Sequence, residues 1–509
     1  MSRINTNVQS LLAQRVLGQN QNGLRSSLER LSTGLRINRG KDDPAGLIAS
    51  ENLRSEMKSI NSAIGNAERA DQVVNIAEGG LQEVSGLLTE LQGLITASAS
   101  KAGLSGSEKA ANQLQIDSIL QTIDRIASAT SFQGMKLLNG NFDYKVSSVA
   151  SGVTDFRVNG AKFNGSSLSV DVLVTQSAQQ AGLYLSMGGT ALDLGAASST
   201  FTVEIAGSLG SRELTFTSGA TVANIAAAIN SFKEITGVEA SVVASGGANG
   251  VKLFSSNFGS AEFVSSKVIH DGGAVGSGIY NLLSNNFNAL DTTAGPIAYN
   301  SSTASQGVRD DGLDIGATIN GLSATSNGKT ARINSDFLDI ELTFNTSTAQ
   351  TLGAVGTGQT MKLTGGGADF QLAGQVDIAG KVSLGIGDVA TRKLGDSSHG
   401  LLSTLASGKA NNLVDSKGDV AQEIVNKAIE QVSSLRGRLG AFQKNTVGAT
   451  IRSLGIAVEN TAAAESTIRD ADFAGETAAL TRSQILVSAS TQVLGLANTA
   501  PQSVLQLLG

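Results

Sequence analysis

Residues 53–95 decide the fold, and they read LRSEMKSINSAIGNAERADQVVNIAEGGLQEVSGLLTELQGLI. Apolar side chains recur along this stretch at steps that alternate between three and four residues. A mean step of about 3.5 residues is the period of a coiled coil. We therefore predict one helix, roughly 63 Å long at 1.5 Å per residue. Its predicted rod seam is Leu53, Met57, Ile60, Ile64, Val74, Leu81, Val84, Leu88, Leu91 and Ile95, with Ala67 and Ala77 in phase and Asp71 as the polar position.

Signals on either side of this stretch bound the helix and predict a second one. Asp43 is the expected N-cap, and Pro44 is the expected first helical residue because proline is tolerated in the first turn. A Gly/Ser loop follows at 103–107, and an apolar stripe then runs over 116–126. We expect this second helix to end at Gln133-Gly134.

Both ends of the chain predict further helices. One apolar stripe near the C-terminus is Val425, Ile429, Val432, Leu435, Leu439 and Phe442, and Ala489 belongs to another. Long helices cannot bury their own stripes, so the two ends must meet each other or other chains. We expect a self-assembly core formed by Leu17, Leu24, Leu28, Leu31, Leu35, Leu486, Val493 and Leu496.

The two ends also carry opposite charge. Residues 1–41 hold seven basic side chains against one acid, Glu29, whereas residues 459–476 hold five acids against one base, Arg469. Exposed ion pairs contribute little to stability. The complementarity is therefore either chance or an aid to docking the two arms.

The middle of the chain has the two-residue period of β-strands. Strand-like runs cover 168–172, 201–205, 214–216, 238–243, 251–254, 338–344, 370–372 and 382–386. A short helix is expected over 221–232, and Asn327-Gly328 is a typical hairpin turn. The predicted class is α+β and multidomain. The N- and C-terminal segments pair as long coiled-coil-like α-helices, and the central insertion is mostly β with a short helix.

Composition and motifs argue against catalysis. The chain has no Cys, only two His and a net charge of −6, which excludes thiol chemistry and disfavours nucleic acid. His270 and His399 lack the spacing of a zinc peptidase. The Gly-rich stretch 353–360 has Gln359 where a P-loop needs Lys. The acidic run 310–314 lacks the spacing of a calcium loop.

We therefore expect no catalytic residue, no cofactor and no metal. No apolar run is long enough to span a membrane, since about 18 such residues are needed. The first residues contain no apolar stretch, so no cleaved secretory signal is expected.

Several motifs, in order, closely resemble bacterial flagellin. They are Ile4-Asn5-Thr6-Asn7, LSTGLRIN at 31–38, DDPAGL at 42–47, RLGAFQ at 438–443, IRDADFA at 468–474, and Ala497-Asn498 with PQSVL at 501–505. The strand-helix-strand segment over 200–268 is similar to a repeat inserted in many flagellins and hook-associated proteins.

The resemblance implies a structural subunit, exported unfolded by the flagellar type III secretion apparatus, that polymerises into the extracellular filament for motility. Its implied partners are other flagellin subunits, the flagellar cap and hook-junction proteins, and an export chaperone. Residues 1–41 with 460–509 would form a terminal core that is disordered in the monomer. Residues 42–185 with 365–459 would form a helical rod domain with β-hairpins, and residues 186–364 variable, mainly β outer domains.

One family site is altered in this chain. A Toll-like receptor recognises many flagellins at a Gln-Arg pair followed four residues later by Leu. The aligned positions here are Thr89, Glu90 and Leu94. The leucine matches, but an acid replaces the basic residue, so we expect weak receptor activation.

Two other functions share some of these features. A hook–filament junction protein has similar terminal motifs, although the full set favours the filament subunit. A β-rich middle could also give the filament an adhesive outer domain.

Overall fold

The structure of the chain is a computed structural model that describes residues 6–99, 105–163, 167–196, 199–245, 248–275, 278–283, 286–291, 295–356, 359–396, 399–414 and 418–506. The chain divides into two compact units. The first comprises residues 1–72, 370–381 and 440–509, and the second comprises residues 73–369 and 382–439. Long terminal helices and a β-rich insertion confirm the predicted α+β class. The division into three functional parts stays a prediction.

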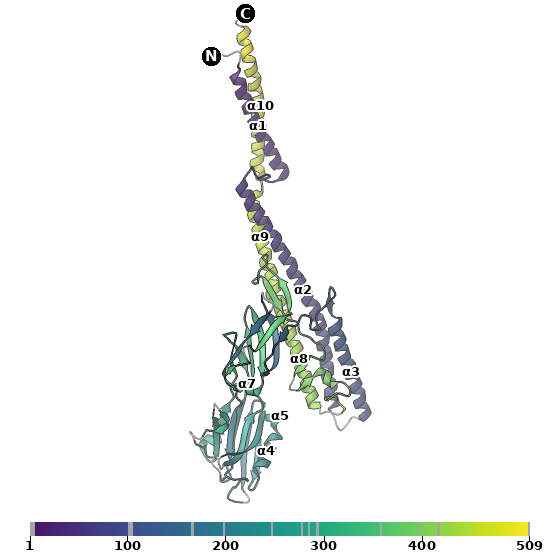
Figure 1. Ribbon diagram of the computed structural model, residues 1–509, viewed down its shortest axis with the longest axis vertical. Coiled ribbons are helices and arrows are strands. Elements are labelled where there is room, and N and C mark those ends of the chain that lie inside the picture. The colour runs from purple at the N-terminus through teal and green to yellow at the C-terminus, as the bar shows by residue number, and fades with distance from the viewer. Residues whose placement is uncertain are drawn as a thin grey trace. The chain divides into compact units, whose positions relative to one another are not determined.

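The first unit is built mainly from helices. They are α1 (Val8–Thr33), the beginning of α2 (Pro44–Ser98), α9 (Gly448–Arg469) and α10 (Phe473–Gln506). Asn7 caps α1 by accepting from the Ser10 amide at 3.1 Å, and Gly34 ends it in the left-handed region at φ 72°. Asp43 caps α2 by accepting from the Gly46 amide at 2.9 Å, as the sequence predicts. Within this unit α1 and α10 run side by side (Figure 1).

The second unit contains the rest of α2, with α3 (Gly106–Ala129) and most of α8 (Gly418–Ala441). Ser105 and Glu108 form a reciprocal capping box at the start of α3. Residues 103 and 104 of the predicted loop lie outside the described part of the chain. The predicted end of α3 was wrong, because the helix stops at Ala129 and Gln133-Gly134 instead turn a hairpin with φ of 47° and 84°. That hairpin joins β1 (Ser131–Phe132) and β2 (Met135–Lys136).

Three sheets surround one hydrophobic core, to which Val158, Val174, Ile340 and Leu363 contribute. Their orders are β18-β19-β20-β4, β17-β16-β6-β21 and β3-β22-β5. The strands are β3 (Lys145–Ser147), β4 (Val153–Ala161), β5 (Leu168–Val170), β6 (Val172–Gln176), β16 (Gly316–Ile319), β17 (Leu322–Ser323), β18 (Thr325–Asn327), β19 (Thr330–Asn334), β20 (Leu338–Phe344), β21 (Gly353–Ala354) and β22 (Met361–Gly365), and α7 (Thr346–Gln350) follows β20.

A second core lies between two further sheets, ordered β10-β11-β7-β13-β14 and β15-β12-β8-β9, and includes Leu183, Val251, Phe201 and Val264. The strands are β7 (Gly182–Ser186), β8 (Thr200–Gly207), β9 (Ser211–Thr217), β10 (Val238–Ser245), β11 (Ala248–Ser255), β12 (Phe263–His270), β13 (Gly278–Leu283), β14 (Asn286–Leu290) and β15 (Val308–Asp311). The predicted short helix is α4 (Val222–Asn230), and α5 (Lys233–Thr236) and α6 (Ser302–Gln306) accompany it.

Short elements complete the described chain. They are β23 (Ala368–Gln371) paired with β24 (Lys381–Leu384), β25 (Gly395–Asp396) paired with β26 (Gly400–Leu401), the 3-10 helix η1 (Leu402–Leu405) and the π-helical turn η2 (Phe442–Val447).

Candidate functional site

The fully buried side chains between α1 and α10 are small or polar and follow coiled-coil spacing. Ser10, Ala13 and Ser27 of α1 are buried there, as are Ser490 and Ala497 of α10. Half-buried side chains fill the same heptad positions: Leu17, Asn20, Leu24 and Leu31 on α1, and Ser483, Val487 and Leu494 on α10. Small side chains let two helices approach closely but remove little apolar area from water.

Hydrogen bonds cross this surface along its length. The side-chain amide of Asn7 donates to the carbonyl of Ala497 at 2.8 Å, and the Ser10 hydroxyl donates to Asn498 Oδ1 at 2.7 Å. Further along, Asn20 Nδ2 donates to the Ser490 hydroxyl at 2.7 Å. Such bonds are directional and contribute about 1 kcal/mol each, net of the exchange with water.

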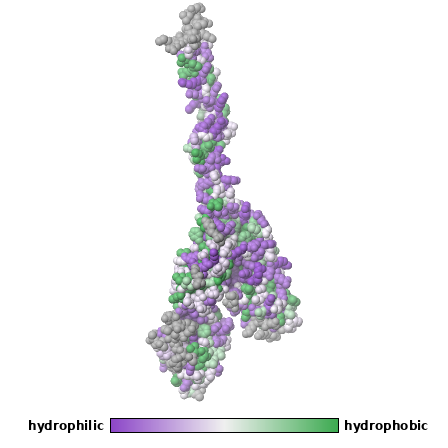
Figure 2. Space-filling model, in the orientation of Figure 1, coloured by the Kyte–Doolittle hydropathy of each residue, from purple (hydrophilic) through white to green (hydrophobic). Residues whose placement is uncertain are grey.

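Many other large apolar side chains of the two helices point away from this surface. Figure 2 shows several hydrophobic patches on the visible side of the α1–α10 pair. The exposed residues are Val8, Leu11, Leu12, Val16, Leu28, Ile485, Leu486, Val493 and Leu496. Isolated exposed apolar residues are ordinary, but a dense set on one helix pair indicates an interaction surface.

The predicted assembly residues divide between the two surfaces. Leu17, Leu24, Leu31 and Leu35 are half-buried, and Leu28 is 49% exposed. On α10 the predicted residues lie outside the helix pair, with Leu486, Val493 and Leu496 exposed at 43%, 56% and 72%. Sequence reasoning missed the real α10 seam, which is Ser483, Val487, Ser490, Leu494 and Ala497. The heptad spacing of Ser and Asn on α1, at positions 10, 20 and 27, is the signal that points to a polar partner.

The link between the arms and the inner helices is tied by backbone bonds. The Arg36 amide donates to the Arg469 carbonyl at 2.6 Å, and the Ala471 amide donates to Gly34 O at 2.9 Å. Of the charge complementarity, Arg30 reaches Glu476 at 3.7 Å, whereas Arg39 pairs with Glu29 of its own arm at 2.8 Å. Between the described residues of 1–41 and 459–476, one ion pair, Arg30 with Glu476, therefore joins the two arms. Its contribution to docking stays a prediction.

The predicted rod seam is buried over most of its length. Ile60, Val74, Leu81, Val84, Leu88, Leu91 and Ile95 are buried, and Leu53, Met57 and Ile64 are half-buried. In the second unit Arg436 Nε donates to Glu78 Oε1 at 2.8 Å, which ties α8 to α2. The receptor-aligned Thr89 and Glu90 are exposed and Leu94 is half-buried.

A polar cluster joins α8 to the outer strands. Arg438 donates to the side-chain oxygen of Asn159, whose amide donates to Asp339 at 3.1 Å. Asp339 also accepts from Arg332 at 3.1 and 3.2 Å, beside a cleft of about 490 Å³. Burial lowers the pKa of Arg438, against the opposing effect of the nearby Asp339 carboxylate. The network therefore connects α8 with β4, β19 and β20, and these residues serve as structural contacts rather than as reactive groups.

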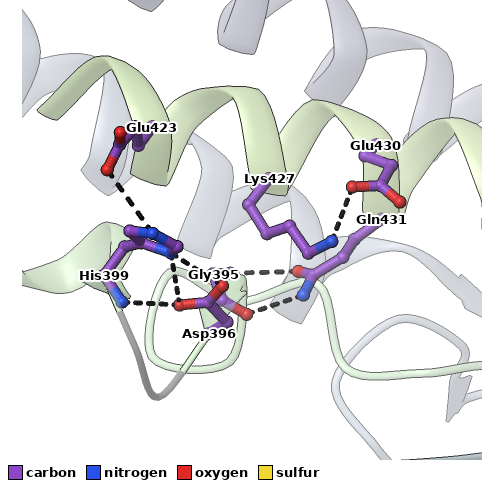
Figure 3. A network of polar contacts seen from close by, with 7 residues as sticks. All are labelled: Gly395, Asp396, His399, Glu423, Lys427, Glu430 and Gln431. Carbon is purple, nitrogen blue, oxygen red and sulfur yellow. Dashed lines mark hydrogen bonds and ion pairs between the residues drawn. The ribbon is translucent and has the colours of Figure 1, made fainter. Parts of the chain in front are cut away.

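The two histidines serve structural contacts. His399 Nδ1 lies 3.0 Å from Asp396 Oδ2 and its Nε2 lies 3.5 Å from Glu423 Oε2, so the ring links the β25–β26 turn to α8 (Figure 3). Gln431 reinforces the link by donating to the Gly395 carbonyl at 2.6 Å. His270 Nδ1 lies 2.9 Å from the Thr200 carbonyl.

Residues of the acidic run 310–314 and of the Gly-rich stretch 353–360 make structural hydrogen bonds. Asp314 Oδ1 accepts from the amides of Ser260 and Gly328 at 3.1 and 2.7 Å, so its carboxylate is occupied by backbone donors. Gln359 accepts from Ser169, while residues 357 and 358 of the same loop lie outside the described residues. Over the described ranges there is no group of three or more His, Cys, Asp and Glu that could hold a metal. No helix in those ranges is long and apolar enough to cross a bilayer.

These features define a class of protein: a structural subunit whose paired terminal helices leave apolar surface exposed. Comparison with known proteins agrees. Residues 4–143 match the bacterial flagellin N-terminal helical region, 422–508 the bacterial flagellin C-terminal helical region, and 200–257 the flagellin hook IN motif.

Relatives align over nearly the whole chain. The B-type flagellin of Pseudomonas aeruginosa is 30% identical over 99% of both chains, and the flagellin of Salmonella choleraesuis is 28% identical over 99% of both. Among solved structures, FliC from Burkholderia pseudomallei covers 74% of this chain and 99% of its own, at 15% identity and a TM-score of 0.23. The chain belongs to the bacterial flagellin family. It is therefore a structural protein that polymerises into the flagellar filament.

Proposed function

We propose that the outward apolar residues of α1 and α10 are the surface through which subunits assemble. The observation that carries this proposal is a partial inversion of the helix pair: its fully buried residues are small or polar, whereas Leu28, Leu486, Val493 and Leu496 lie outside. Covering one such leucine or valine with a neighbouring subunit gains about 1.5–3 kcal/mol. The half-buried Leu17, Leu24, Leu31 and Leu35 complete the proposed self-assembly core.

The same inversion supports ordering of the arms on assembly. Fixing the backbone of a residue costs about 1–2 kcal/mol. A seam whose fully buried residues are only serines and alanines, and whose leucines and valine are half-buried, offsets little of that cost. Residues 1–41 and 460–509 are thus proposed to be disordered in the free subunit and helical in the filament.

The remaining two parts of the chain have separate proposed roles. The buried seam Leu53–Ile95 keeps residues 42–185 with 365–459 folded as a rod before assembly, and residues 186–364 form the outer domains. The family resemblance supports export by the flagellar type III apparatus, a chaperone partner, and contacts with cap and hook-junction proteins. It also supports a filament located outside the cell and a chain with no enzymatic activity.

Cysteine footprinting tests the assembly surface directly, because the natural chain has no Cys to interfere. Single cysteines at Leu486, Val493 and Leu496 should react rapidly with a maleimide in free subunits and about ten-fold or more slowly in filaments. Ser490→Cys on the inner seam should react rapidly in free subunits only if the arms are unpaired. Equal labelling of Val493→Cys in both states would contradict the proposal, and Leu209→Cys, in the β8–β9 turn, controls for general shielding.

Receptor activation by this chain should be weak. Reversing the charge at a receptor contact costs about 2–4 kcal/mol, so potency in a reporter-cell assay should be at least about 30-fold below that of an activating flagellin. Thr89→Gln with Glu90→Arg should recover part of it. Glu83→Arg, on an exposed position of the same helix, should not. Nanomolar potency of the natural chain would sink this prediction.

A further inference from the structure

A π-helical turn interrupts the helical run from Gly418 to Arg469. It is η2, between α8 and α9, and the Gly448 amide beyond it donates to the carbonyl of Gln443, five residues back. An α-helix pairs each amide with the carbonyl four residues back. Single π turns of this kind are rare and often lie at functional positions.

The burial pattern shows what the turn accommodates. Before it, the buried seam follows steps of four and three residues: Ala421, Val425, Ala428, Val432, Leu435, Leu439 and Phe442. After it, the same steps resume from the buried Val447 through the half-buried Ile451, Leu454, Val458, Thr461, Glu465 and Ile468. The single step of five, between Phe442 and Val447, means that the chain carries one residue more than an unbroken heptad. An inserted residue must shift the phase of a heptad seam unless the helix is locally unwound.

Local contacts hold the extra residue in this position. Phe442 packs on Phe370 with ring centroids 6.0 Å apart, which anchors the first side of the turn. Lys444 and Asn445 are exposed, so the widened turn faces water. A Cβ on Gly448 would lie 3.3 Å from the Gln443 carbonyl oxygen, closer than ordinary packing. A side chain at 448 therefore requires the Gln443 carbonyl, the acceptor of the five-residue hydrogen bond, to shift by a few tenths of an ångström.

We propose that residues 442–448 form a register switch that determines which face of α9 is buried. With the π turn, Val447 faces inward and Ile456, 61% exposed, faces outward. With α-helical hydrogen bonds throughout, α9 rotates by about 100°, one residue of a 3.6-residue turn, and position 446 replaces Val447 on the buried face. That the outward face of α9 meets neighbouring subunits rests on the proposed assembly function, whereas the switch itself does not.

Labelling of single cysteines in the full-length, unpolymerised subunit tests the switch. In the natural background, Val447→Cys should react slowly with a maleimide and Thr446→Cys faster. Adding Gly448→Ala should reverse this order, with a change of about ten-fold or more at position 447. Leu439→Cys, on the seam before the turn, should stay slow throughout and reports that the subunit remains folded.

Deletion of Asn445 separates a register switch from a local clash. The deletion removes the extra residue, so the cysteine replacing Val447 should stay slow both with Gly448 and with Gly448→Ala. Three results would overturn the proposal: slow labelling at position 447 in Gly448→Ala alone, no rescue by the deletion, or fast labelling in the deletion variant with Gly448. Each is measured without polymerisation, so a failure of the assembly proposal does not affect it.

Discussion

Replacing Val493 and Leu496 together by Asn should abolish filament formation at concentrations where the natural chain polymerises fully. Both side chains point away from α1 and are more than half exposed in the single subunit. Each substitution removes about 1.5–3 kcal/mol of favourable free energy that the natural side chain gains when neighbouring subunits bury it. Since 1.4 kcal/mol is a factor of ten, the critical concentration should rise at least about a hundred-fold.

The measurement is sedimentation of polymer across a concentration series, with far-ultraviolet circular dichroism of the unpolymerised subunit as a check on folding. A matched control is Leu209→Asn with Leu322→Asn, two exposed leucines of the β insertion at 68% and 54%. The control should polymerise like the natural chain. If the α10 variant sediments at the natural concentration, these residues are not the assembly surface.

Leu88→Ala in the rod seam should lower the free energy of unfolding by about 2–5 kcal/mol. Leu88 is fully buried in α2 of the second unit, between Val84 and Leu91 of the same stripe. Removing three carbons there loses the transfer free energy and leaves a cavity that rigid helices cannot close. Urea denaturation followed by circular dichroism measures the change.

Ile76→Ala is the matched control for this loss. Ile76 lies on the same helix but is 39% exposed and off the seam. Its truncation should change stability by roughly 0.5 kcal/mol or less, as for most surface substitutions. Equal losses in the two variants would show that the 3.5-residue seam does not carry the stability of the rod.

The two helical seams show how far an apolar stripe in the sequence locates the surface that a helix buries within one subunit. In α2 the large apolar residues are also the inward ones, so the period of Leu81, Leu88 and Ile95 locates the buried face. In α10 the inward positions mix small and apolar residues, with Ser490 and Ala497 buried and Val487 and Leu494 half-buried. Hydropathy therefore selected Leu486 and Val493, which lie outside the pair. A stripe of leucines identifies a surface that becomes buried, but not which chain buries it.

The β insertion shows a different limit. Alternation correctly placed strands such as β8 and β20. The hairpin predicted at Asn327-Gly328 turns one residue later, at Gly328 and Lys329, because Asn327 still pairs with Thr330. Pairings such as β7 with β11 and β13 depend on side chains far apart in the sequence, and a period of two carries no information about the neighbour. The π turn was missed for a related reason: a five-residue step between Phe442 and Val447 is visible only when burial is known on both sides.

The hydrogen bonds between α1 and α10 also fix how the two helices align along their axes. Asn7 and Ser10 bond to Ala497 and Asn498, and Asn20 donates to the Ser490 hydroxyl and the Leu486 carbonyl. Sliding the helices by one residue, about 1.5 Å, would misalign these donors and acceptors. An interface made only of apolar side chains would tolerate many such offsets at little cost in free energy. In a filament of many identical subunits, a small offset repeated in every subunit accumulates over its length. These hydrogen bonds contribute little to stability, but they give every subunit the same axial alignment of α1 and α10 and therefore the same length.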